Sequence, residues 1–455
     1  MTTPLTLFGS VLRKLNPAEV DANFLALQAT ADGAMAILQG GSNDIGTPGC
    51  PGFGVGICPG PLPSGMSAMS GCKDPTSDNY GNYTYSDGSV MVWIPAFYYK
   101  WGTGANTLAL NAVSIKPFSA FTDVPTANAA GYALHRMFYD GGAVQSGVFV
   151  DKYLCSNNGG VASSLKNGNP LSTAGDHSPL SGLVGAPANA YYGTIAAAKT
   201  RGANFFCKTR FIHAGLALLS MAHAQASTST IWCAWYNPTY NFPKGCNNNA
   251  LGDVNDSALA FVSDGSASYP NCSKTGSANF FARTTHNGQN SGVADLNGCM
   301  WEVSPGFVTD DAGTTYYALK TSAQMKALTG GSGGATDLWG AAGIAALYDA
   351  LGATFGAATA SNTAKYYGAT VQVFSEATAG TSWQATGLGL PLVGGTGGTN
   401  AFGSDGLWDY RPGGMCPISG GSWTDGSYAG VWAFNLDVVR SYSSYNVGFR
   451  SALYL

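Results

Sequence analysis

Apolar residues near the start of the chain recur at spacings that alternate between four and three positions. They are Val20, Phe24, Leu27, Ala31, Ala34 and Leu38. Just before them, Asn16, Pro17 and Glu19 supply a helix N-cap, a first-turn proline and a capping glutamate. The pattern predicts an amphipathic helix within residues 1–40, with a heptad seam of under about three repeats. Such a seam either helps to hold a homotrimer together, in which the globular parts also contact one another, or packs the helix against its own domain.

Two later runs have the composition of β-strands, and a third has that of a buried helix. Residues 90–99 (VMVWIPAFYY) and 147–153 (GVFVDKY) are rich in valine and aromatic residues, which predicts strands. Residues 211–223 (FIHAGLALLSMAH) are apolar nearly all round, which predicts a buried helix. His213 and His223 are ten positions apart rather than four, so we expect ordinary buried or rim histidines and not a helical metal pair.

Residues 41–87 are dominated by turn-forming and small residues. Glycine, proline, serine and cysteine are dense there, and this composition resists both helix and central strand. We therefore expect a linker or extended arm, either flexible or stapled through Cys50, Cys58 and Cys72.

Residues 88–455 are expected to form one domain. It carries an insertion at about residues 308–406 that is rich in alanine, glycine and threonine. Thr336 is a candidate N-cap for a helix that would end at Leu351. Insertions of this kind often frame a binding face or contact a neighbouring subunit.

Residues 420–455 combine fixed ends with an adaptable middle. At one end Trp423 follows a glycine pair that includes Gly421, and at the other residues 448–450 (GFR) provide a bend, an apolar anchor and a fork of donors. The stretch between them, TDGSYAGVWAFNLDVVRSYSSYN, contains no Lys, Glu, Gln or Met. It is rich in Tyr, Ser, Asn, Asp and Gly, as recognition loops are. We interpret the segment as a binding face rather than a catalytic centre.

A Trp-Glu pair lies upstream of this segment, in residues 295–303 (DLNGCMWEV). Trp301 supplies core area, and Glu302 is a candidate partner for a buried arginine such as Arg450. We interpret Glu302 as half of a structural ion pair.

Five short motifs together resemble the formylglycine-generating-enzyme-like branch of the C-type lectin fold. They are VWIP at 92–95, DKY at 151–153, the Trp-Glu pair at 301–302, GGSW at 420–423 and GFR at 448–450. More narrowly, GGSW…AGVWAFNL…NVGFRSAL is similar to the variable proteins of diversity-generating retroelements, the family that includes phage major tropism determinants. The resemblance covers roughly residues 88–455 and departs from the family at 154–156 and at Cys299. It implies an α+β, loop-rich C-type lectin fold with a short N-terminal helix.

In that family, copying through a template repeat changes adenines, so asparagine codons become codons for most residue types but never Lys, Glu, Gln, Met or Trp. The resemblance implies that ten positions reachable in this way contact a receptor. They are Thr424, Asp425, Tyr428, Asn435, Asp437, Val438, Val439, Tyr442, Ser444 and Tyr445. The implied scaffold of this face is Trp301, Glu302, Gly421, Trp423, Gly448, Phe449 and Arg450. Adenine changes cannot produce Trp432, which therefore belongs with the scaffold.

Composition narrows the classes of partner. Only 10% of residues are charged and the formal net charge is −4, so we expect no nucleic-acid partner and no polybasic membrane patch. We expect neither a signal peptide nor membrane insertion, because no segment has the required apolar run. The ten cysteines lack paired Cys-x-x-Cys spacing. They are either disulfides formed after release from a cell or, as we favour, buried thiols.

If the chain were an enzyme, the terminal segment would need catalytic or metal-binding residues, and it lacks them. Copper-binding members of the resembled fold use a cysteine pair there, whereas residues 424–446 contain no cysteine and Cys416 stands alone before them. The five histidines are dispersed, which disfavours a clustered iron site. We therefore expect no catalytic residue, no metal ligand and no cofactor, with structural calcium left open. The alternative is a formylglycine-generating-enzyme-like, sulfatase-modifying oxidoreductase or an inactive relative.

Residues 16–24 (NPAEVDANF) also resemble the N-terminal segments of phage tail-fibre and tail-tip proteins, which usually attach a fibre to the virion. The sequence thus predicts a phage receptor-binding protein, made in the bacterial cytoplasm and carried on the virion. Its expected partners are a host-cell surface receptor, protein or glycan, and other tail proteins that contact the N-terminal region. A cellular surface-displayed variable protein is a third hypothesis, which the tail-fibre-like start disfavours.

Overall fold

The computed structural model describes residues 43–175, 177–185, 188–226, 272–278, 284–296, 298–329, 344–352, 364–394, 402–403 and 405–455. The helix expected within residues 1–40, with its attachment and oligomerisation roles, lies outside this part of the chain. The described residues form a mixed α+β structure that is rich in short strands and loops and has few helices.

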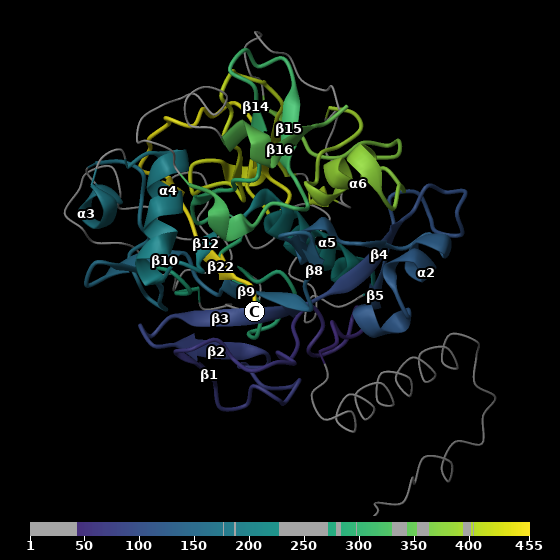
Figure 1. Cartoon of the computed structure of the whole chain (residues 1–455), viewed down its shortest axis with the longest axis horizontal. Coiled ribbons are helices and arrows are strands. Elements are labelled where there is room, and N and C mark those ends of the chain that lie inside the picture. The colour runs from purple at the N-terminus through teal and green to yellow at the C-terminus, as the bar shows by residue number, and fades with distance from the viewer. Residues whose placement is uncertain are drawn as a thin grey trace, which may run out of the picture.

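A six-stranded antiparallel sheet forms one end of the molecule (Figure 1). In spatial order its strands are β1 (Met66–Ala68), β2 (Asn82–Tyr85), β3 (Val90–Pro95), β9 (Gly147–Asp151), β22 (Ser451–Leu453) and β12 (Phe206–Cys207). The C-terminal strand β22 therefore lies inside the sheet, paired with β9 on one side and β12 on the other. This pairing ties the end of the chain to the strands that begin the domain.

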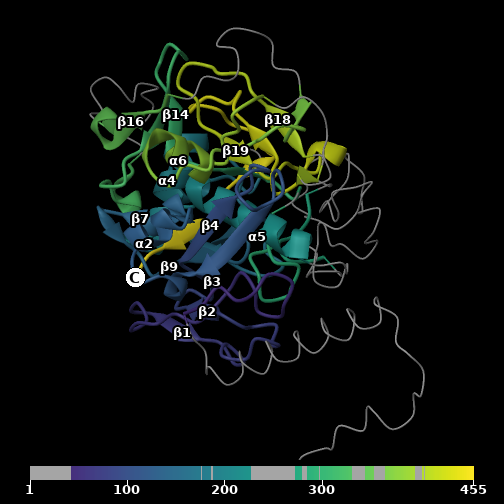
Figure 2. The ribbon, with the colours of Figure 1, turned by 90° about the vertical axis from the view of Figure 1, so that its right-hand side faces the viewer.

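A second six-stranded sheet lies towards the opposite end, as the two perpendicular views show (Figure 2). Its strands, in spatial order, are β17 (Lys365–Tyr366), β18 (Gly406–Trp408), β20 (Phe434–Asn435), β19 (Ile418–Ser419), β13 (Trp301–Val303) and β21 (Val447–Gly448). The β18–β20 and β13–β21 pairs are parallel and the others are antiparallel. Residues 301–303, residues 365–366 and strands from residues 406–448, which are far apart in sequence, thus meet in this sheet.

Smaller sheets and short helices surround these two. The remaining strands are β4 (Phe97–Trp101), β5 (Val113–Pro117), β6 (Ala133–Leu134), β7 (Tyr139–Asp140), β8 (Ala143–Val144), β10 (Cys155–Asn158), β11 (Val161–Ser164), β14 (Phe307–Thr309), β15 (Tyr316–Leu319) and β16 (Tyr348–Ala350). The α-helices are α2 (Val124–Ala129), α3 (Ser181–Val184), α4 (Ala190–Ala198), α5 (Arg210–Ala226) and α6 (Gly380–Gly387). The 3-10 helices are η1 (Phe118–Ala120), η2 (Arg136–Phe138), η3 (Lys199–Arg201), η5 (Met325–Ala327), η6 (Ile344–Leu347) and η8 (Gly426–Tyr428).

Helix α5 lies between the two six-stranded sheets (Figure 2). Every residue from Arg210 to His223 is buried, so the prediction of a buried helix over residues 211–223 is confirmed. The strands predicted over 90–99 and 147–153 are also present, as β3 with β4 and as β9. No helix in the described ranges is long and apolar enough to cross a membrane.

The described part of the Gly/Pro/Cys-rich region is built into the domain, which corrects its interpretation as a linker. Ile45, Phe53 and Val55 are fully buried in the main core, and β1 and β2 extend the first sheet. Gly52 has a φ of +77°, and a Cβ there would approach the Tyr80 ring to 2.9 Å. Apolar residues are spaced here by tight turns rather than by a helical or strand period, which is why the pattern gave no sign of packing.

Six described cysteines are buried free thiols, as favoured from the sequence. They are Cys58, Cys72, Cys155, Cys207, Cys299 and Cys416. The large apolar core makes covalent staples unnecessary at these positions.

The insertion departs from the helix expected between Thr336 and Leu351. Residues 344–347 form the 3-10 helix η6, and residues 348–350 form strand β16, which pairs with β15. Residues 336–343 lie outside the described residues. The strand forms because pairing with β15 satisfies its backbone groups. Alanine favours a helix more than any other residue, but helix propensity is a weak preference that tertiary contacts override.

A cluster of buried charges joins the two six-stranded sheets. The Arg450 guanidinium donates to both carboxylate oxygens of Glu302, at 2.6 and 3.0 Å, and the Lys208 Nζ lies 2.8 Å from Glu302 Oε2. All three side chains are fully buried. The remaining Arg450 donors reach the carbonyls of Asp151, Lys152 and Ala294 at 2.8–3.2 Å. The pairing of Glu302 with Arg450 is therefore confirmed.

The charge states follow from this geometry. Burial on its own would raise the pKa of Glu302, but Arg450 and Lys208 together hold that pKa below its ordinary value. Burial lowers the pKa of Lys208 to about 8, and Glu302 acts against the fall. Glu302 is thus a carboxylate at neutral pH, shared between two cations.

We predict that Glu302→Gln destabilises the fold by about 3–5 kcal/mol, because it leaves two buried cations without a counter-charge. Urea denaturation of the full chain measures this. The control is Asp349→Asn, which removes an exposed pair with Lys320 at 3.8 Å and should cost less than about 1 kcal/mol. Equal losses for the two variants would contradict the central role of Glu302.

Four buried histidines predict acid sensitivity. Burial lowers the pKa of His135 and His223 to about 3 and of His286 to about 4, and it also lowers that of His213. In the unfolded chain these pKa values are about 6.5. The unfolded chain therefore binds more protons between roughly pH 6.5 and 4, so stability falls as pH falls through this window.

Each such histidine contributes up to about 1.4 kcal/mol per pH unit. Asp295 contributes with the opposite sign, since burial raises its pKa to about 6 although Arg450 opposes the rise. Burial also raises the pKa of Asp140 and Asp425, but the pKa shifts of the four histidines are larger. We expect the urea midpoint to drop clearly between pH 7 and pH 5. A midpoint that is constant over this range would show that the histidines are accessible to protons in the folded chain.

Candidate functional site

The first anchor of the C-terminal segment is a tight glycine turn that buries Trp423. Gly421 has a φ of +75°, and a Cβ there would lie 2.6 Å from the Ala429 Cα. Trp423 is 1% exposed and packs with Leu154 and Met300. The chain is therefore fixed in place before the polar stretch begins.

The second anchor begins at β21, the strand that precedes Arg450. Gly448 is buried, and a Cβ there would lie 2.7 Å from the Leu171 carbonyl oxygen. Phe449 is fully buried in the main core. Strand β21 pairs in parallel with β13, so Trp301 and Glu302 lie directly beside Val447 and Gly448.

Ser422 is a hydrogen-bond hub that joins the two ends of the segment. Its backbone N–H and hydroxyl both donate to Asp425 Oδ2, each at 2.7 Å. The same hydroxyl lies 2.9 Å from Thr424 Oγ1 and accepts from Asn446 Nδ2 at 3.3 Å. The Ser444 hydroxyl donates to Asn446 Oδ1 at 2.7 Å. Thr424, Asp425 and Ser444 are thus brought together, while Ser422 and Asn446 are linking residues that the sequence reasoning missed.

Asp425 is held inward by this network. Burial raises its pKa, although hydrogen bonds from Ser422 and from Trp301 act in the opposite direction. The side chain shapes the turn as well as lining its surface. A Ser-x-x-Asp spacing, which favours local side-chain to backbone bonds, was the sequence signal for it.

An aromatic cluster of Trp301, Tyr366, Trp408 and Tyr428 lies next to this turn. Tyr428 stacks on Tyr366, with ring centroids 5.0 Å apart and an interplanar angle of 20°. Trp408 lies 5.8 Å from Tyr428 and 5.4 Å from Trp301. Trp301 is buried, whereas the other three are half-buried and reach the surface.

Tyr366 comes from the insertion at about residues 308–406, to which the sequence reasoning assigned no recognisable chemistry, and Trp408 lies just after the insertion. Strands β17 and β18 bring them to Tyr428. The density of aromatic residues in residues 406–410 (GLWDY) was the signal that could have found one of them.

Asn435 and Asp437 continue the same surface. In the parallel β18–β20 pair, Asn435 is the register partner of Trp408. The Asp437 backbone N–H donates to Asn435 Oδ1 at 2.8 Å. Both side chains are half-buried, so they lie at the surface on a backbone that the sheet holds.

Tyr442 and Tyr445 are the most exposed of the predicted contact residues, at 39% and 37%. The Tyr445 ring lies 5.9 Å from Trp423 and 6.0 Å from His177. The backbone N–H of the adjacent Ser444 donates to Thr173 Oγ1 at 2.8 Å. The tyrosines are therefore displayed from a backbone that buried neighbours fix.

The prediction that Val438 contacts a receptor is wrong, because its side chain does not face solvent. It is 5% exposed and belongs to the main core. Its carbonyl accepts from the Cys416 backbone N–H at 2.8 Å, and a bridge joins Val439 to Met415. This strand-like pairing turns Val438 inward and leaves Val439 half-buried, an alternation that a list of codons cannot reveal.

Trp432 lies in the core, as expected. It is 3% exposed, and its ring lies 5.2 Å from Phe402 and 5.3 Å from Tyr367. The described residues hold no group of three or more His, Cys, Asp or Glu side chains placed to bind a metal ion.

The thiols near the segment are not activated. Burial raises the pKa of Cys207 to about 12 and raises that of Cys416 as well. Reactive cysteines need a lowered pKa in a partly exposed, electropositive environment. These two cysteines are therefore poor candidates for the chemistry of an oxidoreductase.

Comparison with known proteins gives a distant structural likeness. No family model and no curated protein matches the sequence. Among solved structures, the chain resembles the Major Tropism Determinant U1 Variant and the Major Tropism Determinant I1 Variant. For each, the identity is 12% and the TM-score is 0.28, over 88% of this chain and 74% of the other. At this distance the likeness carries no inference about the site, which depends on the residues described above.

We predict different costs for truncating an anchor and a displayed residue. Trp423→Ala should destabilise the fold by about 3–5 kcal/mol, because it empties a buried ring site. Tyr442→Ala, at an exposed position, should stay within about 1 kcal/mol of the parent chain. Urea denaturation of both variants checks this, and a large loss for Tyr442→Ala would mean that the segment is structural throughout.

Proposed function

We propose that this chain is a phage tail receptor-binding protein that recognises a host-cell surface ligand through its C-terminal segment. One observation carries the proposal. Seven of the predicted contact positions, Thr424, Asp425, Tyr428, Asn435, Asp437, Ser444 and Tyr445, lie in one chain of contacts around Ser422 and the aromatic cluster. These side chains are half-buried or exposed, while Ser422, Trp301 and Trp423 beside them are buried.

This arrangement suits adaptable recognition. Tyrosine supplies rigid contact area with little loss of conformational entropy, and Ser, Thr and Asn supply adaptable hydrogen bonds. We assign the energetic centre to Tyr428 with Tyr366 and Trp408, because stacked aromatic residues are typical interface hot spots. Asp437 and Asn435 would provide polar selectivity beside them.

The positions of the five motifs support a C-type lectin scaffold of the formylglycine-generating-enzyme-like type. VWIP lies in β3, DKY begins at the last residue of β9, and the Trp-Glu pair opens β13. GGSW follows β19, and GFR links β21 to β22. All five therefore lie in or directly beside the two six-stranded sheets, as a shared scaffold requires.

The proposal extends to variation and display. Retroelement copying would vary the surface positions, and since most exposed substitutions change stability little, the fold would tolerate them. The N-terminal region would attach the chain to other tail proteins as a homotrimer on the virion. Several linked copies would raise a modest affinity by avidity. We assign the chain no catalytic role and no cofactor.

The test is binding of the fluorescently labelled full chain to intact cells of a panel of bacterial strains, measured by flow cytometry. We expect selective binding to some strains. Tyr428→Ala and Tyr366→Ala should each weaken it about tenfold or more, which is the loss expected of an interface hot spot.

Tyr85→Ala is the matched control, since Tyr85 is a half-buried tyrosine on β2 in the other sheet that stacks edge-on to Phe205. It should leave cell binding unchanged. Failure to bind any strain, or equal losses for Tyr85→Ala and Tyr428→Ala, would overturn the proposed function.

A further inference from the structure

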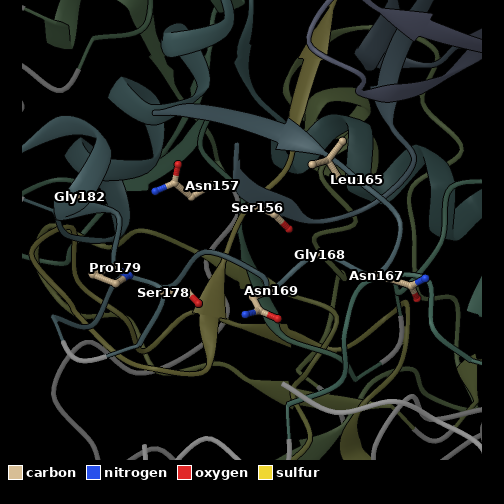
Figure 3. Close-up of a pocket in the computed structure, with 9 residues that line it drawn as sticks. All are labelled: Ser156, Asn157, Leu165, Asn167, Gly168, Asn169, Ser178, Pro179 and Gly182. Carbon is tan, nitrogen blue, oxygen red and sulfur yellow. The ribbon is translucent and has the colours of Figure 1, made fainter. Parts of the chain in front are cut away.

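A polar pocket lies between the β10–β11 hairpin and the loop that leads to α3 (Figure 3). Its volume is about 480 Å³, within the range of about 300–1,000 Å³ that is typical of small-molecule sites. Its lining residues are uncharged and mostly amides and hydroxyls. They are Ser156, Asn157, Leu165, Asn167, Gly168, Asn169, Ser178, Pro179 and Gly182.

The state of the Ser156 hydroxyl indicates that the pocket binds a ligand. The residue is 3% exposed, and its hydroxyl has no hydrogen-bond partner. Figure 3 shows this hydroxyl directed from the hairpin towards Gly168 and Asn169. Buried hydroxyls are nearly always paired, because an unpaired one costs roughly 1–3 kcal/mol. A ligand hydroxyl in the pocket would supply the missing partner.

The opposite wall of the pocket is held in place by Thr275, which is fully buried. Thr275 accepts from the Gly168 backbone N–H at 2.9 Å, and its carbonyl accepts from the Asn167 N–H at 2.6 Å. Asn167 itself has a φ of +60°, a conformation that asparagine tolerates better than most residues. The amides of this wall are therefore presented on a rigid loop, which lowers the entropy lost on binding.

The pocket adjoins the C-terminal segment. Ser178 lines it, and the Ser178 carbonyl accepts from the Ser172 backbone N–H at 2.9 Å. The neighbouring His177 ring lies 6.0 Å from Tyr445. One loop thus forms a wall of the pocket and contacts the proposed receptor-binding surface.

We propose that this pocket binds a neutral saccharide unit of the host-surface ligand. Sugar hydroxyls both donate and accept, as do the amides and hydroxyls of the lining residues, whereas the uncharged lining offers nothing to neutralise an anion. Leu165 and Pro179 add apolar surface for the C–H faces of a sugar ring. The site deepens the proposed function, on which it rests for the source of the glycan.

The test uses the full chain on a microarray of bacterial glycans, followed by NMR titration with the methyl glycoside of the sugar common to the bound glycans. We expect binding that Asn169→Ala and Ser156→Ala each weaken at least tenfold. Ser156→Ala removes a hydroxyl that has no partner, so its Tm should be unchanged or higher, which separates loss of binding from loss of fold. Ser181→Ala, exposed on α3 and outside the lining, should bind like the parent chain.

Absence of glycan binding, or equal affinity of Ser156→Ala and the parent chain, would overturn the pocket proposal. These outcomes are distinguishable from failure of the proposed function. If cells are bound and Tyr428→Ala abolishes that binding while no glycan is bound, the receptor-binding function stands without the saccharide pocket. If a glycan is bound through Ser156 but the chain binds no cells, the saccharide pocket is supported and the receptor-binding function is contradicted.

Discussion

The arrangement of the molecule depends on one buried carboxylate shared by two cations. Glu302 belongs to β13 in the second sheet, and Arg450 lies between β21 and β22, where the chain passes into the first sheet. Lys208 joins them from the segment before α5. Buried charges are tolerated only when they are paired and their remaining donors are satisfied. Arg450 meets this demand by donating to the carbonyls of Asp151, the last residue of β9, and of Lys152. One ion-pair network therefore ties together the two sheets and the segment that leads into α5.

The same network gives the C-terminal segment a fixed base. Trp423 and Arg450 hold the two ends of the C-terminal segment, and the Ser422 hub links those ends to each other. Tyr428 and Tyr445 are displayed between these anchors, on a backbone held by sheet pairing and by Thr173. Since the stabilising contacts are made by the buried anchors, the exposed side chains contribute little to the stability of the fold.

The sequence predicts those parts of the molecule whose pattern is local. Helix α5 and strand β3 could be predicted because a continuous apolar run and a run rich in valine and aromatic residues each indicate an element locally. The pairing of Glu302 with Arg450 could be predicted because a buried carboxylate requires a cationic partner. The inward turn of Val438 and the packing of residues 43–87 could not, since both depend on pairing with distant strands or on irregular turns. The contribution of Tyr366 and Trp408 was missed for the same reason, because only the β17–β18–β20 order brings them to Tyr428.

The most direct test of a diversified binding face is the sequence of the gene and its flanks in many sibling phages or lysogens. We expect substitutions confined to the ten predicted codons. Polar and aromatic exchanges should occur at Tyr428, Asn435 and Tyr445, and only apolar residues at the buried Val438. A near-copy repeat and a reverse transcriptase gene should lie nearby. An invariant C-terminal segment without such a repeat would contradict the account of how this surface is used.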